Sequence, residues 1–292
     1  MKDIPIITTR FNTKDGLELH GHLYEPARRT EKIIIHIHGL IGNFYENLFV
    51  DAIAREAVEN GWALLSFNNR GAGIVTDFVK KRASICAYER IGGSVERFED
   101  SFFDIDAAIR FAVRRGYREI TLQGHSLGCQ KAVYYCSKAK SKKVRGIIFL
   151  APVDDVACAK TFLGKRIKAS LKIAQQLAQS KKQVRLPAYM EFYPLMSAAR
   201  FLDIASPESL AGSLLDYNGS MKLLRSLQVP VLAIFCEKDQ YQPDSVRALD
   251  VLKATLPRCE TKLISGGGHL FPKKEKILAK TVSTWLKERT VR

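Results

Sequence analysis

Long apolar runs are missing from this chain of 292 residues. None approaches the ~20 residues that a helix needs to span a bilayer, so we predict no transmembrane segment. The first residues, MKDIPIITTRFNTKDG, also lack the apolar centre of a secretory signal, and a cytoplasmic location is expected. With 46% hydrophobic and 26% charged residues, the chain has the composition of an ordinary globular protein with a full core.

Closely spaced cysteines are missing as well. The six cysteines form no CxxC pair and no Cys/His cluster with the spacing of a zinc site. The pairs His20/His22 and His36/His38 lie on predicted strands without acidic or cysteine ligands beside them, so we interpret these histidines as structural. We therefore expect free thiols, in keeping with a reducing compartment, and no metal site.

Acidic residues are scarce relative to basic ones, which leaves a net charge of +16. Such a charge concentrates anions near the surface. No helix-turn-helix, zinc finger or aromatic RNA-binding motif accompanies it, so we expect solvated basic faces and no nucleic-acid partner. Binding to nucleic acid or to anionic membranes is the alternative.

Short β-branched runs alternate with amphipathic segments of helical length. Residues 4–11 and 17–24, joined by Asp15 and Gly16, predict a β-hairpin. Runs that are apolar on both faces, typical of buried parallel strands, are found at 32–38, 62–67, 119–123, 144–150, 229–235 and 260–265. Helices are predicted over 46–60, 98–115, 127–139, 244–254 and 273–288. This order predicts an α/β fold, with a mostly parallel mixed sheet and helices on both faces.

The alternation stops between Ala151 and Gln228, where no convincing strand is found. A basic amphipathic helix is predicted over 160–184. Its apolar face holds Leu163, Ile167, Leu171, Ala174 and Ala178, and its other face holds Lys165, Lys168 and Lys172. We predict a helical cap, residues 153–228, inserted into a core of residues 1–152 and 229–292, because open α/β sheets bind ligands at the carboxyl ends of their strands. A solvated helix packed on the core and a membrane-surface helix are the alternatives.

The sequence Gly124-His125-Ser126-Leu127-Gly128 follows a predicted strand and precedes a predicted helix. G-x-S-x-G is a weak pattern by itself. Between a strand and a helix it is typical of a sharp turn that exposes the serine hydroxyl, with glycines where side chains would collide. Ser126 is therefore the candidate nucleophile.

A serine nucleophile needs a base, and the base needs a carboxylate that orients it. His269 lies in the glycine-rich loop SGGGHLFP after the last predicted strand, so it is the candidate base. Asp239 follows another buried strand and lies between Ser126 and His269 in chain order, so it is the preferred acid. Asp154 and Asp155, which follow the preceding strand, are the competing acids.

Acyl transfer also needs N–H donors for the developing oxyanion. The backbone N–H of Leu127, directly after the nucleophile, is one candidate. The backbone N–H of Leu40, after the turn at Gly39, is the other.

These motifs together resemble those of the α/β-hydrolase superfamily. The matching segments are HIHGLIGN, NNRGAG, GHSLG, LAIFCEKDQYQP and GGGHLF, in the order of that superfamily and across nearly the whole chain. The resemblance implies an eight-stranded sheet, a cap after the sixth strand and the triad Ser126, Asp239 and His269. More narrowly, the chain is similar to capped serine hydrolases near siderophore esterases and feruloyl-type esterases.

The chain departs from the superfamily at one position. Asn68 stands where many members have aspartate, in the sequence Asn68-Asn69-Arg70-Gly71. A role for Arg70 in binding substrate is therefore not carried over, and structural support of the loop is expected.

The sequence thus predicts a carboxylesterase that acts on a small or medium ester through an acyl-enzyme on Ser126, without a metal or an organic cofactor. The alternatives are a peptidase or amidase, an acyl-thioesterase, and a noncatalytic binding protein of the hydrolase fold. An aromatic substrate pocket is expected from Phe44, Tyr45, Tyr189, Phe192 and Tyr193. The positive charge would suit an anionic substrate, and a monomer or a homodimer is expected.

Overall fold

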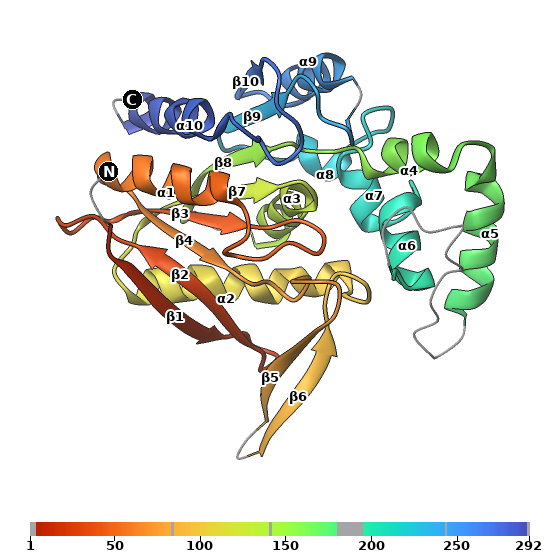
Figure 1. Ribbon diagram of the computed structural model, residues 1–292, viewed down its shortest axis with the longest axis horizontal. Coiled ribbons are helices and arrows are strands. Elements are labelled where there is room, and N and C mark those ends of the chain that lie inside the picture. Colours follow the sequence, from red (N-terminus) through yellow and green to blue (C-terminus); the bar gives the residue numbers. More distant parts are fainter. Residues whose placement is uncertain (1–3, 83–84, 140–141, 180–194, 243, 291–292) are drawn as a thin grey trace.

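The computed structural model describes residues 4–82, 85–139, 142–179, 195–242 and 244–290 (Figure 1). Its main sheet has eight strands in the order β1-β2-β4-β3-β7-β8-β9-β10. Strands β1 (Ile6–Asn12) and β2 (Glu18–Tyr24) form the predicted antiparallel hairpin, and β2 also pairs antiparallel with β4 (Ala63–Phe67). The parallel strands are β3 (Lys32–Ile37), β7 (Glu119–His125), β8 (Val144–Leu150), β9 (Val231–Cys236) and β10 (Cys259–Ile264). The predicted mostly parallel sheet is confirmed.

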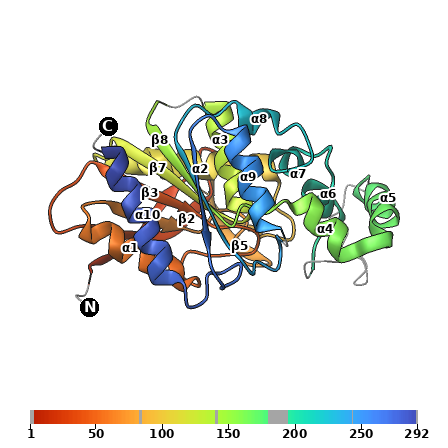
Figure 2. The ribbon, with the colours of Figure 1, turned by 90° about the horizontal axis from the view of Figure 1, so that it is seen from above.

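Helices cover both faces of this sheet, as predicted. Helices α1 (Leu48–Glu59) and α10 (Glu275–Thr290) pack together over one face. Helix α2 (Ser101–Arg114), which follows a 3-10 turn at Phe98–Asp100, and helix α3 (Leu127–Ala139) lie on the other face (Figures 1 and 2). Strands β4 and β9 are consequently buried along their whole length, in agreement with their apolar sequences.

Strand β10 differs from the prediction of a strand buried on both faces. Its residues alternate between exposed and partly buried positions up to Ile264. The reason is its place at the edge of the sheet, where β9 is its one neighbouring strand. Helix α9 (Ser245–Thr255) packs against it, and the polar side chains of Glu260 and Lys262 belong to the alternating pattern.

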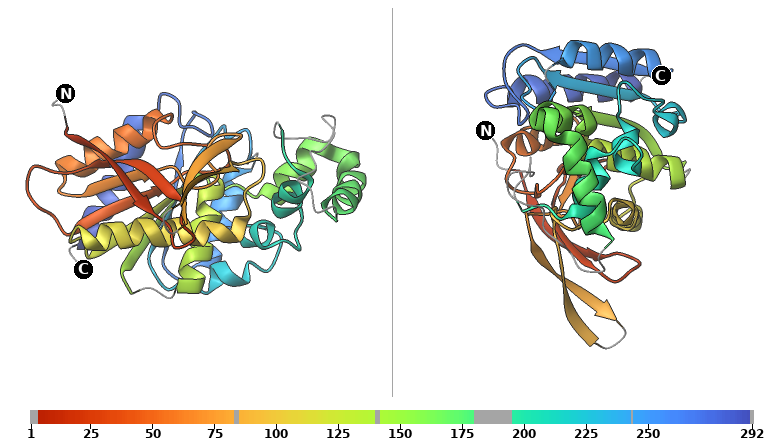
Figure 3. Two further views of the ribbon diagram at one scale, coloured as in Figure 1. Left: turned by 90° about the horizontal axis from the view of Figure 1, so that it is seen from below. Right: turned by 90° about the vertical axis from the view of Figure 1, so that its right-hand side faces the viewer.

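A second hairpin was not predicted from the sequence. Strands β5 (Thr76–Arg82) and β6 (Ile85–Ile91) pair antiparallel and project away from the main sheet (Figures 1 and 3). An isolated bridge between Leu17 and Lys80 joins the hairpin to the turn before β2. Because the hairpin has little core to cover, its strands carry many charged residues and lack the apolar signature of the central strands.

The segment between β8 and β9 is helical where the structure describes it. Its helices are α4 (Asp155–Leu163), α5 (Ile167–Ala178), α6 (Ala198–Ala205), α7 (Leu210–Leu214) and α8 (Lys222–Arg225). Helices α4, α5 and α6 lie beyond the carboxyl ends of β7 and β8 (Figures 1 to 3). Within the described residues, no helix is both long enough and apolar enough to cross a membrane.

The predicted continuous helix over 160–184 is wrong at its start. Gly164 has φ of 54° and separates α4 from α5, with a 3-10 turn at Gly164–Arg166. A residue in this left-handed conformation cannot continue a right-handed helix. The predicted division of faces is confirmed, because Leu163 and Ala174 are buried whereas Lys165 and the other two lysines of that face are exposed.

Candidate active site

Ser126 stands at a sharp turn between β7 and α3. Its φ is 54°, a left-handed conformation that is unfavourable for a residue with a side chain. A Cβ atom on Gly124 would overlap Gly128, and a Cβ atom on Gly128 would overlap the carbonyl oxygen of Ile37. Both glycines are therefore sterically required, and the predicted elbow geometry is present. The hydrogen bond from Ser126 N to Leu150 O, 2.9 Å long, ties the turn to β8.

His269 and Asp239 meet at the same edge of the sheet. His269 Nδ1 lies 2.9 Å from Asp239 Oδ2 and 3.2 Å from Asp239 Oδ1. A carboxylate can only accept a hydrogen bond, so Nδ1 carries a proton, and in the neutral imidazole this tautomer leaves the lone pair on Nε2. Both side chains are buried, and Tyr241 N donates a further hydrogen bond of 2.9 Å to Asp239 Oδ1.

The two competing carboxylates have other partners. Asp154 caps α4 by accepting a hydrogen bond from Ala157 N at 2.8 Å. Asp155 accepts one from Gln130 Nε2 at 2.7 Å. Among the described residues, neither forms a hydrogen bond or an ion pair with His269. The structure therefore brings Asp239, and neither of its competitors, to the imidazole.

Three further residues hold the imidazole in place, and the sequence did not single them out for this role. Gln240 Oε1 accepts a hydrogen bond from His269 N at 3.2 Å. His125 Nε2 donates one to His269 O at 3.0 Å, since the carbonyl can only accept. The ring of Tyr241 meets the His269 ring edge to face, with centroids 4.7 Å apart. Burial lowers the pKa of His125 well below its ordinary value, so this ring is a neutral support.

The loop of Gly39 and Leu40 adjoins the serine turn. A Cβ atom on Gly39 would lie 2.9 Å from Ser126 Cβ and 3.2 Å from Leu127 N. Leu127 is the first residue of α3, a position whose N–H has no acceptor within its own helix. Leu40 and Ser126 line the same cavity. The two predicted oxyanion donors therefore belong to neighbouring loops that meet at Ser126.

The segment after β4 fixes the position of this loop. Asn69 N donates to His38 Nε2 at 3.0 Å, and His38 Nδ1 donates to Gly39 O at 2.9 Å. Asn68 Oδ1 accepts a hydrogen bond from Phe44 N at 3.0 Å. Burial lowers the pKa of His38 to about 3, which keeps the ring neutral and able to accept from Asn69. Asn68 thus serves as a neutral acceptor for the loop.

Arg70 has the structural role that the sequence predicted. Its Nη2 lies 2.9 Å from Asp104 Oδ1 and 3.1 Å from Asp15 Oδ2, and its Nη1 lies 3.5 Å from Asp100 Oδ2. The guanidinium is buried and connects the loop after β4 with the first hairpin and α2. It does not line the cavity that contains Ser126.

That cavity has a volume of about 230 Å³. Its described lining consists of Gly39, Leu40, Ile41, Gly42, Glu46, Asn47, His125, Ser126, Gln240, Tyr241, His269 and Leu270. Ser126 and His269 both line it without forming a hydrogen bond to one another, which is common before substrate binds. A nucleophile, a base and candidate oxyanion donors thus face one small space, an arrangement suited to acyl transfer.

Neither of the two described residues of the predicted aromatic pocket lines this cavity. The Phe44 ring packs on His22, with centroids 4.7 Å apart, and Tyr45 is 69% exposed. Tyr189, Phe192 and Tyr193 lie outside the described residues.

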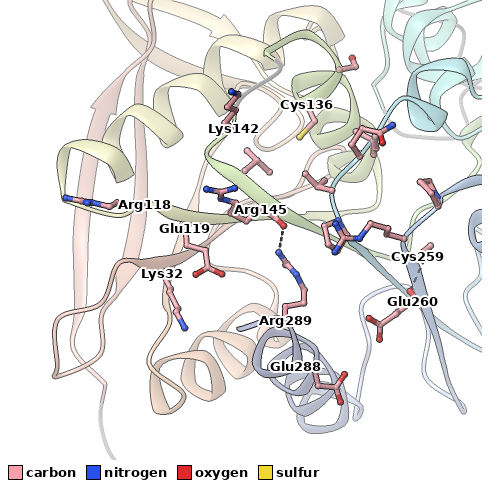
Figure 4. Close-up of a pocket in the computed structure, with 18 of the residues that line it drawn as sticks. Lys32, Arg118, Glu119, Cys136, Lys142, Arg145, Cys259, Glu260, Glu288 and Arg289 are labelled. Atoms are coloured by element: carbon pink, nitrogen blue, oxygen red, sulfur yellow. Dashed lines mark hydrogen bonds between the residues drawn. The ribbon is translucent and has the colours of Figure 1, made fainter. Parts of the chain in front are cut away.

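A larger groove lies at the opposite edge of the sheet (Figure 4). Lys32 and Glu119 contribute to it from the amino ends of β3 and β7, and Arg145 and Arg289 meet there through a hydrogen bond from the guanidinium to the Arg145 carbonyl. Helix carboxyl ends such as that of α10 point to this edge, and their partial negative charge accounts for basic residues there. No histidine belongs to its described lining, so this groove lacks a serine and histidine constellation.

No group of three or more histidine, cysteine or acidic residues suited to holding a metal ion occurs among the residues that the structure describes. The cysteines that the sequence analysis expected to be free are free.

Comparison with known proteins identifies the fold. A family model described as "Protein of unknown function (DUF1749)" matches residues 81–287. No curated protein matches the chain. The structure resembles the siderophore hydrolase EstB from Aspergillus fumigatus, with a TM-score of 0.70, 18% identity and coverage of 98% of both chains. It also resembles Est1E from Butyrivibrio proteoclasticus with ferulic acid bound, with a TM-score of 0.68, 17% identity and coverage of 97% of this chain and 99% of that one.

A third similar structure is the α/β hydrolase GrgF from Penicillium sp. sh18, with a TM-score of 0.66, 17% identity and coverage of 96% and 97% of the two chains. These likenesses extend over nearly the whole chain, so it has the α/β-hydrolase fold that its motifs predicted.

Proposed function

The chain belongs to the family of proteins of unknown function DUF1749, and we propose that this member is a serine hydrolase that cleaves carboxylic esters. The observation that carries the proposal is the cavity lined by both the strained Ser126 and His269, whose Nδ1 is held by Asp239. A strained serine conformation is unfavourable for folding, and such strain is found mainly at functional sites.

In the proposed reaction, Ser126 Oγ attacks the ester carbonyl while His269 Nε2 takes the hydroxyl proton. The carboxylate of Asp239 stabilises the imidazolium through Nδ1. The backbone N–H groups of Leu40 and Leu127 stabilise the negative oxygen of the tetrahedral intermediate. The ester C–O bond then breaks, and the departing alcohol takes the proton from His269.

The resulting acyl group on Ser126 is removed by water. His269 Nε2 accepts a proton from the water as its oxygen attacks the acyl carbonyl. Collapse of the second tetrahedral intermediate breaks the bond to Ser126 Oγ, which recovers its proton from His269, and the carboxylic acid is released. The serine proton leaves with the alcohol and a proton from water replaces it, so Ser126 and His269 recover their starting protonation states, and the chemistry requires no metal or organic cofactor.

The helices between β8 and β9 act as the cap of this site in our proposal, with residues 153–228 as the cap and residues 1–152 and 229–292 as the core. The place of α4, α5 and α6 beyond the carboxyl ends of the strands supports this division (Figure 2). Contacts from α6 hold the cap on the core. Arg200 Nη2 lies 2.8 Å from Glu96 Oε1, and Ser197 N donates to Ser94 O at 3.0 Å.

A cavity of about 230 Å³ supports a small or medium substrate, such as a short-chain ester. The names of the similar proteins, a siderophore hydrolase and a protein with ferulic acid bound, favour ester chemistry over the other reactions that the same triad performs. Amide and thioester hydrolysis are the alternative activities, and noncatalytic binding is the alternative of another class.

Purified protein assayed with a butyrate ester, thioester and anilide tests the proposal. We expect the ester to be cleaved with the highest kcat/KM, and Ser126→Ala to abolish turnover of all three substrates. Preference for the anilide or the thioester would replace the esterase proposal by one of its alternatives. Turnover that survives in Ser126→Ala would show that Ser126 is not the nucleophile.

A further inference from the structure

One acidic residue lines the cavity beside the candidate triad, and it is exposed to solvent. Glu46 belongs to the described lining, whereas no lysine or arginine does. The charge of this lining is therefore opposite in sign to the net charge of +16 of the whole chain. The anionic substrate expected from the net charge would meet a negative wall here, so that expectation does not hold for the described part of the site.

The Glu46 carboxylate is held in a defined position. Asn43 Nδ2 donates a hydrogen bond of 2.6 Å to Glu46 Oε2. Asn43 Oδ1 in turn accepts hydrogen bonds from Tyr45 N at 3.1 Å and from Glu46 N at 2.8 Å. The acid is thus fixed to the end of the loop that begins with Gly39 and Leu40. Among the described residues, no lysine or arginine forms an ion pair with it.

An unpaired carboxylate acts on nearby charges even when solvent reaches it. Coulomb interactions over several ångströms persist at physiological ionic strength, where the Debye length is about 8 Å. The attraction of anions by the rest of the basic surface acts over longer distances and is screened more strongly. Inside the cavity, the local charge of Glu46 therefore has the larger effect on a bound substrate.

We propose that Glu46 is a specificity residue that makes this cavity select neutral or cationic esters over anionic ones. The inference rests on the proposed hydrolase function and names the substrate class of the same site. A positive group on either the acyl or the alcohol part of the substrate would be attracted to the Glu46 carboxylate. A carboxylate or sulfonate at the same place would be repelled by it.

The test uses matched esters that differ in charge alone. One series carries the charge on the alcohol: butyrate esters of choline, of 3,3-dimethylbutanol and of 2-sulfoethanol, which are cationic, neutral and anionic. A second series carries the same three charges at the end of the acyl chain, with one neutral alcohol throughout. Acid release is measured by pH-stat at 0.15 M salt, and kcat/KM is expressed relative to that of the neutral ester.

The variant Glu46→Gln removes the charge and keeps an oxygen that can accept from Asn43. We expect its relative kcat/KM for the anionic ester to rise about three- to tenfold, and that for the cationic ester to fall by a similar factor. Glu46→Lys is expected to reverse the order of the two charged esters. Glu59→Gln is the matched control, because Glu59 is exposed at the far end of α1, about 18 Å along a helix of 12 residues. It should leave both ratios unchanged.

The outcomes separate this inference from the function on which it rests. The wild-type protein could hydrolyse the esters while Glu46→Gln leaves the relative kcat/KM values of the charged esters unchanged. That result would overturn the role of Glu46 and leave the esterase proposal standing. An equal loss on all three esters would also overturn it, because Glu46 would then act on the geometry of the loop. If the wild-type protein cleaved none of the esters, both proposals would be wrong.

Discussion

Nδ1 of His269 lies 2.9 Å from Oδ2 of Asp239, although the two residues are 30 positions apart in the chain. The reason is the parallel pairing of β9 and β10, whose last paired residues are Cys236 and Ile264. Parallel neighbours end at the same edge of a sheet, so the loops that follow them meet there. Asp239 and His269, which lie in the loops after these two strands, are thereby brought into contact.

Asp239→Asn is expected to lower kcat by about 10⁴-fold. The asparagine keeps the shape of the side chain but no longer stabilises the imidazolium or selects its tautomer. Measuring kcat on a short-chain p-nitrophenyl ester, together with a thermal melt, checks this prediction. Asp155→Asn is the matched control, since burial and then the charge of Asp154 raise the pKa of Asp155 to about 7 and make a neutral substitute tolerable. A larger loss of kcat in Asp155→Asn than in Asp239→Asn would indicate that the acid of the triad lies in the loop after β8.

Gly39→Ala is expected to reduce kcat about 10²- to 10³-fold, which is the usual effect of losing one oxyanion donor. The added Cβ atom would lie 2.9 Å from Ser126 Cβ, so the loop must move and carry the Leu40 N–H away. Gly61→Ala is the control for backbone strain without a clash, because Gly61 has φ of 76° and a Cβ atom there meets no atom within 4 Å. The kinetics of both folded variants are compared with the wild type. If the kcat of Gly39→Ala stayed within threefold of the wild-type value, this loop would have no role in stabilising the oxyanion.

Glu96→Gln is expected to lower the free energy of unfolding by about 3–5 kcal/mol. Glu96 lies 2.8 Å from both Lys131 Nζ and Arg200 Nη2, and all three side chains have no exposed surface. Burial alone would raise the pKa of Glu96, but the two cations outweigh it and lower that pKa. Without the carboxylate, the two buried cations lose the negative charge between them, although the 3.4 Å ion pair of Arg200 with Asp203 and the hydrogen bond from Lys131 to Asn69 remain.

Urea unfolding measures the effect of Glu96→Gln, with Glu31→Gln as the control. The ion pair of Glu31 with Arg118 is mostly exposed and should contribute less than about 1 kcal/mol. Equal destabilisation by the two variants would contradict the importance of the buried cluster.

Stability is expected to fall as the pH drops below 6.5. Burial lowers the pKa of His36 and of His38 to about 3. In the unfolded chain these rings take up protons near pH 6.5, so between that pH and about 3 the unfolded state binds more protons and is favoured. Each ring should reduce the free energy of unfolding by about 2 kcal/mol between pH 7 and pH 5.

Urea melts at both pH values check the contribution of His36. His36→Asn should reduce the difference between the two pH values, whereas His20→Asn, at an exposed position, should preserve it. An unchanged difference in His36→Asn would exclude this ring as a source of acid sensitivity.

The parts of the fold that burial determines could be predicted from the sequence. The central strands have to be apolar on both faces, so 32–38 and 229–235 were recognisable. The strain at Ser126 requires its flanking glycines, and the glycine-rich loop of His269 was recognisable for the same reason. Short motifs whose glycines are required by close backbone contacts can therefore be recognised in the amino-acid sequence.

The remaining features depend on contacts between loops that are distant in sequence. Glu46, Gln240 and Tyr241 line the cavity because the loops after β3 and β9 meet there, and no local pattern in the sequence marks them. The hairpin of β5 and β6 buries little and so lacks an apolar signature. The helix break at Gly164 could not be predicted, because the helical spacing of apolar residues continues past it into α5.

The most direct test of the proposed mechanism is to identify the residue that a fluorophosphonate probe labels. The probe reacts with a serine that a base has activated, so it reports on the joint action of Ser126 and His269. We predict one label per chain, mapped by mass spectrometry to the peptide containing Ser126, and no label in Ser126→Ala. Labelling of a different serine, or none in the folded wild-type protein, would contradict the mechanism.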